Sequence, residues 1–110
     1  MIKAEIYYTE GKITGFFVRN HSDYDVEGSD IVCAAVSALV YSALGTIDEL
    51  VKEVDYIEDE EEVVIGFNVP ENCSKKDENL YNIILKNLEI GLMQIENQYD
   101  EYLEVEIKEV

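Results

Sequence analysis

The sequence has few of the residues that cross-link or interrupt small domains. Of its 110 residues only two are cysteine, one is proline and one is histidine, and tryptophan is absent. Two cysteines cannot supply a disulfide framework, so we expect Cys33 and Cys73 to be thiols in a reducing compartment. One histidine and two separated cysteines also exclude a typical zinc site. The fold therefore has to depend on an apolar core.

Basic side chains are also scarce. Eight lysines and arginines stand against 25 acidic residues, which gives a formal charge of −17. Nucleic-acid binding needs clustered lysine and arginine, so the composition excludes a nucleic-acid partner and disfavours anionic membrane surfaces. The same charge favours a basic partner, because a negative field attracts cations.

Long hydrophobic segments are missing as well. The longest apolar run, residues 31–44, is shorter than a bilayer span and contains two serines. Side chains alternate between polar and apolar over residues 1–6, which is unlike a signal peptide. We therefore expect a cytoplasmic protein without a membrane partner. The length and the 47% of hydrophobic residues fit one domain, 1–110, that buries a real core.

Hydrophobic periodicity predicts seven elements in the order ββαββαβ. Alternation with period two predicts strands, and apolar positions at helical spacing predict helices. The second helix is followed by a last strand with one solvent-exposed face. The expected strands are residues 2–8, 13–19, 54–57, 63–69 and 103–107, and the expected helices are 31–44, with an extension to about 53, and 75–97.

This order predicts a two-layer α+β domain, with two helices on one face of an about five-stranded sheet. Ser29 or Asp30 is expected to cap the first helix, which is apolar almost all round and so buried on several sides. We expect Gly45 to end or bend that helix. Thr46 and Glu49 have capping-box spacing, which favours a further turn or two.

His21 and Cys33 are the residues best suited to covalent chemistry. A polar loop, residues 20–29, separates them and is long enough to move. Cys33 is expected in the first helical turn, where the helix dipole and a nearby histidine favour the thiolate. The histidine can take the proton and later deliver it to a leaving amine, and free N–H groups of the turn can stabilise an oxyanion. Composition alone favours the alternative, that Cys33 is a small core residue.

The residues around Cys33 form a distinctive run downstream of His21. The run is Gly28-Ser29-Asp30-Ile31-Val32-Cys33-Ala34-Ala35-Val36-Ser37-Ala38-Leu39. It resembles the ribosomal-processing cysteine protease family, Prp, closely over residues 28–39 and less closely elsewhere. The resemblance implies a cysteine peptidase with Cys33 as nucleophile and His21 as general base and acid.

The resemblance also implies the substrate and the assembly. Family members remove a short N-terminal extension from a large-subunit ribosomal protein, after an aromatic-containing motif and before ribosome assembly. The implied partner is therefore a basic ribosomal protein precursor, and the implied assembly is a homodimer. Asn20 departs from the family pattern, which has glycine before the histidine. Asparagine tolerates left-handed backbone angles better than most residues, so we expect the loop still to turn.

Two residues near Cys33, Asp30 and Ser37, have two interpretations each. Asp30 either orients His21 and shapes the active turn, or caps the helix by accepting the Cys33 N–H. A carboxylate this close also disfavours the thiolate, so the two roles compete. Ser37, one turn after Cys33, either borders the substrate site or, as we favour, is a buried hydroxyl that bonds back to a helix carbonyl.

The loop supplies candidate substrate contacts at Ser22, Asp23, Tyr24 and Gly28. We expect it to be disordered without substrate and to fold over the peptide, bringing His21 to the thiol. Tyr24 is suited either to grip an aromatic substrate side chain or to anchor the loop itself.

No metal or cofactor is expected. The acidic turn, residues 58–62, lacks an ordered ligand spacing, so we expect a solvated turn and not a cation site. Cys73 lies in a polar segment, and we expect it to be incidental.

Two other functions remain open on the sequence. The first is a non-enzymatic acidic module that binds a basic ribosomal protein. The second is a thiol redox sensor, in which Cys33 is the reactive thiol and Cys73 its resolving partner.

Overall fold

The structure, a computed structural model, describes residues 1–20, 27–51, 56–59 and 64–110, with the backbone alone at 20 and 27–30. Its element order is ββαββαβ, which confirms the predicted order. The elements are β1 (Ile2–Thr9), β2 (Lys12–Asn20), α1 (Glu27–Leu50), β3 (Tyr56–Asp59), β4 (Val64–Asn68), α2 (Lys75–Gln98) and β5 (Leu103–Glu109).

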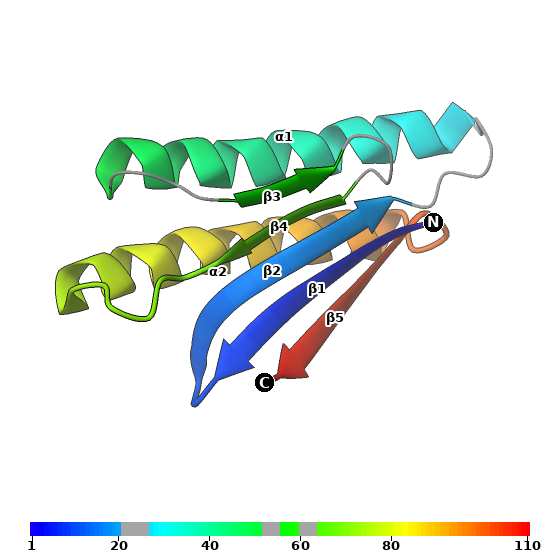
Figure 1. Cartoon of the computed structure of the whole chain (residues 1–110). Coiled ribbons are helices and arrows are strands. Elements are labelled where there is room, and N and C mark those ends of the chain that lie inside the picture. Colours follow the sequence, from blue (N-terminus) through cyan, green and yellow to red (C-terminus); the bar gives the residue numbers. More distant parts are fainter. Residues whose placement is uncertain (21–26, 52–55, 60–63) are drawn as a thin grey trace.

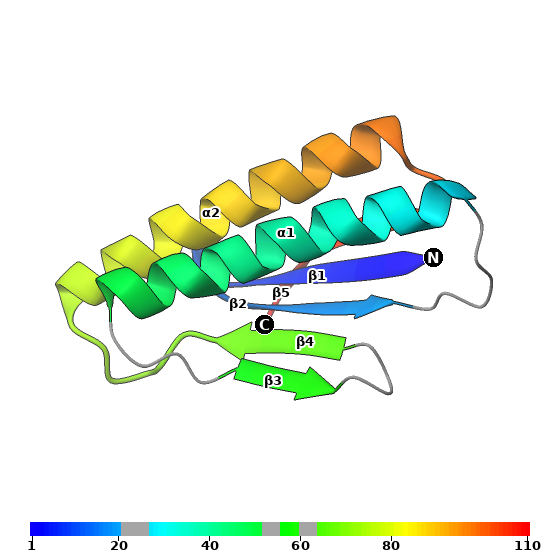
Figure 2. The same ribbon diagram turned by 90° about the horizontal axis from the view of Figure 1, so that it is seen from above.

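The strands form one five-stranded sheet in the order β3-β4-β2-β1-β5. The β1–β2, β2–β4 and β3–β4 pairs are antiparallel, whereas β5 lies parallel to β1. Both helices cover the same face of this sheet, and α1 lies on the side of the β3–β4 edge (Figures 1 and 2). The predicted two-layer α+β architecture is therefore confirmed.

The core lies between the helices and the sheet. Period-two alternation in β1 turns Ile2, Ala4 and Ile6 inward, and the apolar stripes of both helices pack on them. Helix α2 begins at Lys75 as predicted, and Ser74 caps it, because the Ser74 hydroxyl accepts the Asp77 N–H at 3.1 Å. The largest fully buried side chains are Phe16, Ile2, Ile6, Ile47, Leu85, Leu88, Leu92, Leu103, Val32 and Val40.

Helix α1 begins earlier than the capping residues predict. Its first residue is Glu27, so Ser29 and Asp30 lie within the helix and neither is its cap. Asp30 therefore does not occupy the N-cap position that the predicted bond to the Cys33 N–H requires, and its side chain lies outside the described residues. Polar side chains in a first turn are equally compatible with a cap and with early helical positions, which is why the pattern placed the start too late.

The same helix passes through Gly45 without ending. Val40, Leu44 and Ile47 stay buried on one face across the glycine, so packing holds the helix together there. The Thr46 hydroxyl bonds back to the Ser42 carbonyl at 2.8 Å and does not act in a capping box. The helix end predicted as one possibility at Gly45 is wrong, whereas the predicted extension beyond it is confirmed as far as Leu50.

Because α1 is this long, Ile31–Leu50 has the length and composition of a membrane span, with a mean hydropathy of 1.7. A third of it is buried, and that face packs on the sheet through Val32, Val36 and Val40. A core helix of this kind has the same composition as a span. On the opposite side, Ile31, Ala34 and Ala38 form an exposed apolar stripe.

Strand β3 lies two residues later than the prediction of 54–57. Its residues Glu58 and Asp59 pair with Ile65 and Val64 and are not part of a turn. All four β3 side chains are exposed, as is typical of charged edge strands, so apolar alternation gave little indication of the strand's place. The rest of the predicted acidic turn, 60–62, lies outside the described residues.

Candidate active site

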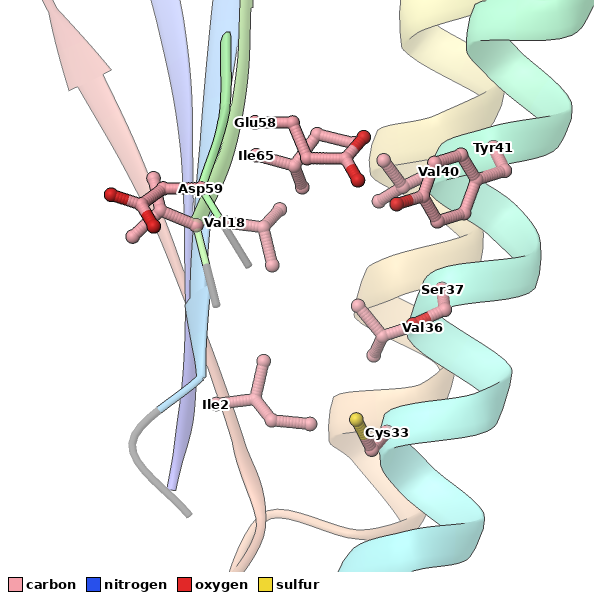
Figure 3. Close-up of a pocket in the computed structure, with 11 residues that line it drawn as sticks. Ile2, Val18, Cys33, Val36, Ser37, Val40, Tyr41, Glu58, Asp59 and Ile65 are labelled. Atoms are coloured by element: carbon pink, nitrogen blue, oxygen red, sulfur yellow. The ribbon is translucent and has the colours of Figure 1, made fainter. Parts of the chain in front are cut away.

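Cys33 is the seventh residue of α1 and lies in its second turn, not in the first turn as expected. Its own N–H therefore falls within the intrahelical ladder, because only the first four N–H groups of a helix lack such a partner. The oxyanion role predicted for the free N–H groups of its turn is not supported. Cys33 is half-buried, and its sulfur points toward the sheet (Figure 3).

The thiol lies on the wall of a cavity of about 280 Å³ between α1 and strands β2, β4 and β3. An engineered cavity of about 150 Å³ holds benzene, so this space accommodates a large aromatic or aliphatic side chain. Most of its lining is aliphatic. The lining residues are Ile2, Val18, Cys33, Val36, Ser37, Val40, Tyr41, Glu58, Asp59, Val64 and Ile65.

Polar groups enter the cavity from two sides. On α1, Cys33, Ser37 and Tyr41 follow one another at intervals of four residues, which places them on one stripe of the helix. From β3 the Glu58 carboxylate lies on the helix side of the sheet, whereas Asp59 points to the other side (Figure 3).

Ser37 borders the cavity and is half-buried. Among the residues that the structure describes, its hydroxyl makes no hydrogen bond to a helix carbonyl. The back-bond that we favoured for Ser37 is therefore not formed, and its role beside a substrate stays a prediction.

Several predicted site residues lie outside the described part of the chain. These are His21, Ser22, Asp23 and Tyr24, together with the side chain of Asp30. Gly28 is described, and it lies in the first turn of α1 and not in a loop. Asn20 is the last residue of β2 and pairs with Ile2, which lines the cavity. The residue before His21 thus lies at the cavity end of the sheet.

Cys73 lies far from this cavity. It precedes α2, whose first turn is at the opposite end of the molecule from the first turn of α1 in both views (Figures 1 and 2). A disulfide needs Cα atoms within about 7 Å, so Cys73 cannot resolve an oxidised Cys33 in this fold. Cys73 packs half-buried against the core. Within the described ranges, no group of three or more histidine, cysteine or acidic side chains is placed to hold a metal ion.

Tyr41 and Glu58 are cavity residues that the sequence analysis missed. The signal for Tyr41 was present, since it lies two helical turns beyond Cys33 on the same stripe. Glu58 carried no such signal, because only its pairing with β4 turns it toward the helix.

A thiol on the wall of an apolar cavity that admits a side chain is compatible with a cysteine protease site. The sequence profile of the family described as cysteine protease Prp matches residues 1–104, and the chain belongs to this family. It is similar to the ribosomal processing cysteine protease Prp of Staphylococcus aureus (strain NCTC 8325 / PS 47), with 29% identity over 90% of this chain and 91% of that protein. The Prp of Bacillus subtilis (strain 168) is 26% identical over 96% of both chains.

Solved structures show the same fold. SMU.848 from Streptococcus mutans superimposes with a TM-score of 0.87 at 22% identity, over 100% of this chain and 96% of that chain. Prp from S. aureus in complex with a substrate peptide gives 0.85 at 24% identity, over 98% and 100%. The same protease with a covalently linked product peptide gives 0.81 at 25% identity, with the same coverage.

Proposed function

We propose that Cys33 is the nucleophile of this protease and that His21 is its general base and acid. The Cys33 thiolate adds to the scissile carbonyl carbon, and His21 holds the thiol proton. When the C–N bond breaks, His21 gives that proton to the leaving amine, and water then hydrolyses the thioester. The observation that carries this assignment is the place of Cys33 on the cavity wall.

The backbone supports His21 as the partner. Asn20 pairs with Ile2, and Ile2 lines the cavity that Cys33 also lines. His21 follows directly in the sequence, so the chain leaves the sheet at the same end as the thiol. We further propose that Asp30 orients His21 and that Ser22, Asp23 and Tyr24 contact the substrate.

The substrate that we propose is the N-terminal extension of a basic large-subunit ribosomal protein. The relatives named above are ribosomal processing proteases, and one was solved with a substrate peptide. A chain of charge −17 attracts a basic precursor, and the aliphatic cavity suits an apolar or aromatic substrate side chain. Such a substrate places the enzyme in the cytoplasm.

Mass spectrometry of a peptide that spans the extension junction, taken from the same organism, tests this function. We expect a single cut by the wild-type protein and none by Cys33→Ala or His21→Ala. Cys73→Ala is the matched control, because it removes the other thiol at the far end of the fold, and it should cut normally. An intact peptide that binds wild type and Cys33→Ala equally would instead favour the acidic binding module.

We also propose that the protein is a homodimer. The exposed stripe on α1 carries no charge and is suited to pack against a second copy of the chain; it consists of Ile31, Ala34 and Ala38. Sedimentation velocity should show a dimer for wild type and a monomer for Ala38→Glu. The control Ile83→Glu, at an exposed position of α2, should remain a dimer. A dimeric Ala38→Glu protein would contradict this choice of interface.

A further inference from the structure

We propose that Glu58 is a specificity-determining residue, which binds a lysine or arginine side chain of the substrate three to four residues from the scissile bond. The proposal rests on the function proposed above, since it takes Cys33 as the point of attack. It adds a second recognition point at the other end of the same cavity.

The strand register fixes where Glu58 points. Glu58 pairs with Ile65, and Ile65 pairs with Val18, so the three side chains form one row across β3, β4 and β2 on the helix side. Figure 3 shows the Glu58 carboxylate opposite Val40 and Tyr41 of α1. The Glu58 side chain is exposed, so its carboxylate lies at the open edge of the largely aliphatic cavity.

Some carboxylates of the sheet and helices already have a cationic partner. Glu5 pairs with Lys108 at 3.1 Å, Glu78 with Lys12 at 2.7 Å and Glu89 with Lys86 at 2.6 Å. Within the described part of the chain, Glu58 makes no ion pair and no hydrogen bond. A carboxylate that faces an apolar cavity without a partner is an acceptor for a charged donor on a ligand.

The spacing along α1 indicates which substrate residue reaches it. Cys33 and Tyr41 are eight residues apart on one stripe, which corresponds to about 12 Å along a helix. An extended peptide advances about 3.3 Å per residue, so this distance spans three to four residues. Glu58 lies opposite Tyr41, and a peptide attacked at Cys33 therefore brings a side chain at that separation to the carboxylate.

The chemistry of the position favours a cation. A carboxylate next to a tyrosine ring is a combination that binds ammonium and guanidinium groups. The overall charge of −17 adds to this preference, because it repels acidic segments from the cavity.

Calorimetric titration of the junction peptide tests the proposal in a Cys33→Ala background, where binding is measured without cleavage. Glu58→Gln should weaken the affinity about five- to tenfold, because glutamine keeps a neutral hydrogen bond where glutamate makes a charge-assisted one. The matched control is Glu104→Gln, which removes the same charge from β5 at the opposite edge of the sheet, and it should change the affinity less than about twofold.

The basic residue is identified by replacing each lysine or arginine within four positions of the cut with norleucine. One replacement should weaken wild-type binding and leave Glu58→Gln binding unchanged. Glu58→Lys should in turn prefer the peptide in which that residue is glutamate, a reversal that a merely structural role would not produce.

The outcomes separate this proposal from the function. Equal affinities of Glu58→Gln and Glu104→Gln, or no binding at all, would overturn the role of Glu58, whether or not wild type cuts the peptide. Binding that depends on Glu58, without a cut by wild type, would support the recognition site and overturn the proposed reaction.

Discussion

The Tyr8 hydroxyl donates a hydrogen bond to the Glu89 carboxylate at 2.5 Å and thereby joins β1 to α2. Glu89 is only 5% exposed, and Lys86 donates to its second oxygen at 2.6 Å. Burial, followed by the hydrogen bond to Glu89, raises the pKa of Tyr8. A buried carboxylate is costly unless such donors satisfy it, so this network holds the second helix on the sheet.

Tyr8→Phe should therefore destabilise the fold by about 1–3 kcal/mol, because it leaves a buried carboxylate oxygen without its donor. Urea unfolding at neutral pH measures this loss. Tyr56→Phe removes a hydroxyl from an exposed side chain of β3 and should change stability by less than about 0.5 kcal/mol. Equal effects of the two variants would show that the Tyr8–Glu89 bond contributes nothing.

Glu5 should make the fold sensitive to acid. The Tyr7 hydroxyl donates to the Glu5 carboxylate at 2.5 Å, and the Lys108 ammonium donates to it at 3.1 Å. These bonds lower the pKa of Glu5 against the opposing effect of burial. Because the folded pKa of Glu5 lies below the unfolded pKa of 4.5, the stabilisation is present above pH 4.5 and is lost as pH falls through the folded pKa.

Urea unfolding between about pH 6 and pH 3 should accordingly show a steeper loss of stability for wild type than for Glu5→Gln. Glu101→Gln, which replaces an exposed carboxylate, should keep the wild-type slope. Parallel curves for wild type and Glu5→Gln would contradict the prediction.

Tyr7 should make the stability of the fold sensitive to alkaline pH. Burial, with a further contribution from the bond to Glu5, raises its pKa from 10.0 to about 12. A raised folded pKa means that the stabilisation is complete below the unfolded value and is lost as pH rises through about 12. Spectroscopic titration of tyrosinate should find a group that titrates at about pH 12 and disappears in Tyr7→Phe. An unchanged late group in that variant would assign it to another tyrosine.

Two glycines should respond to alanine in opposite directions. A Cβ at Gly15 would lie 2.6 Å from the Phe67 carbonyl oxygen and 2.6 Å from Asn68 Oδ1, so Gly15→Ala should cost at least about 1–3 kcal/mol. A Cβ at Gly45 would meet nothing within 4 Å, and Gly45→Ala should stabilise α1 by up to about 1 kcal/mol. Thermal unfolding of both variants checks the signs, and a stabilising Gly15→Ala would contradict the close β2–β4 approach.

Much of the fold was predictable because its signals are local. Alternation in residues 2–8 predicted β1, and the apolar stripe at helical spacing predicted α2 almost to the residue. The run around Cys33 likewise indicated the family, which the match over residues 1–104 confirms.

The sequence by itself thus determined the element order and the two-layer class, because period-two and helical spacing reflect burial along one segment. It also determined the family, through the run of residues around Cys33. Only the tertiary structure decided that α1 runs from Glu27 through Gly45, since packing on the sheet outweighs local helix signals. It alone turned Glu58 into the cavity, because strand pairing with β4 sets that side chain's face. The extent of α1 and the direction of the Glu58 side chain depend on contacts with residues distant in the sequence, so no local pattern predicts them.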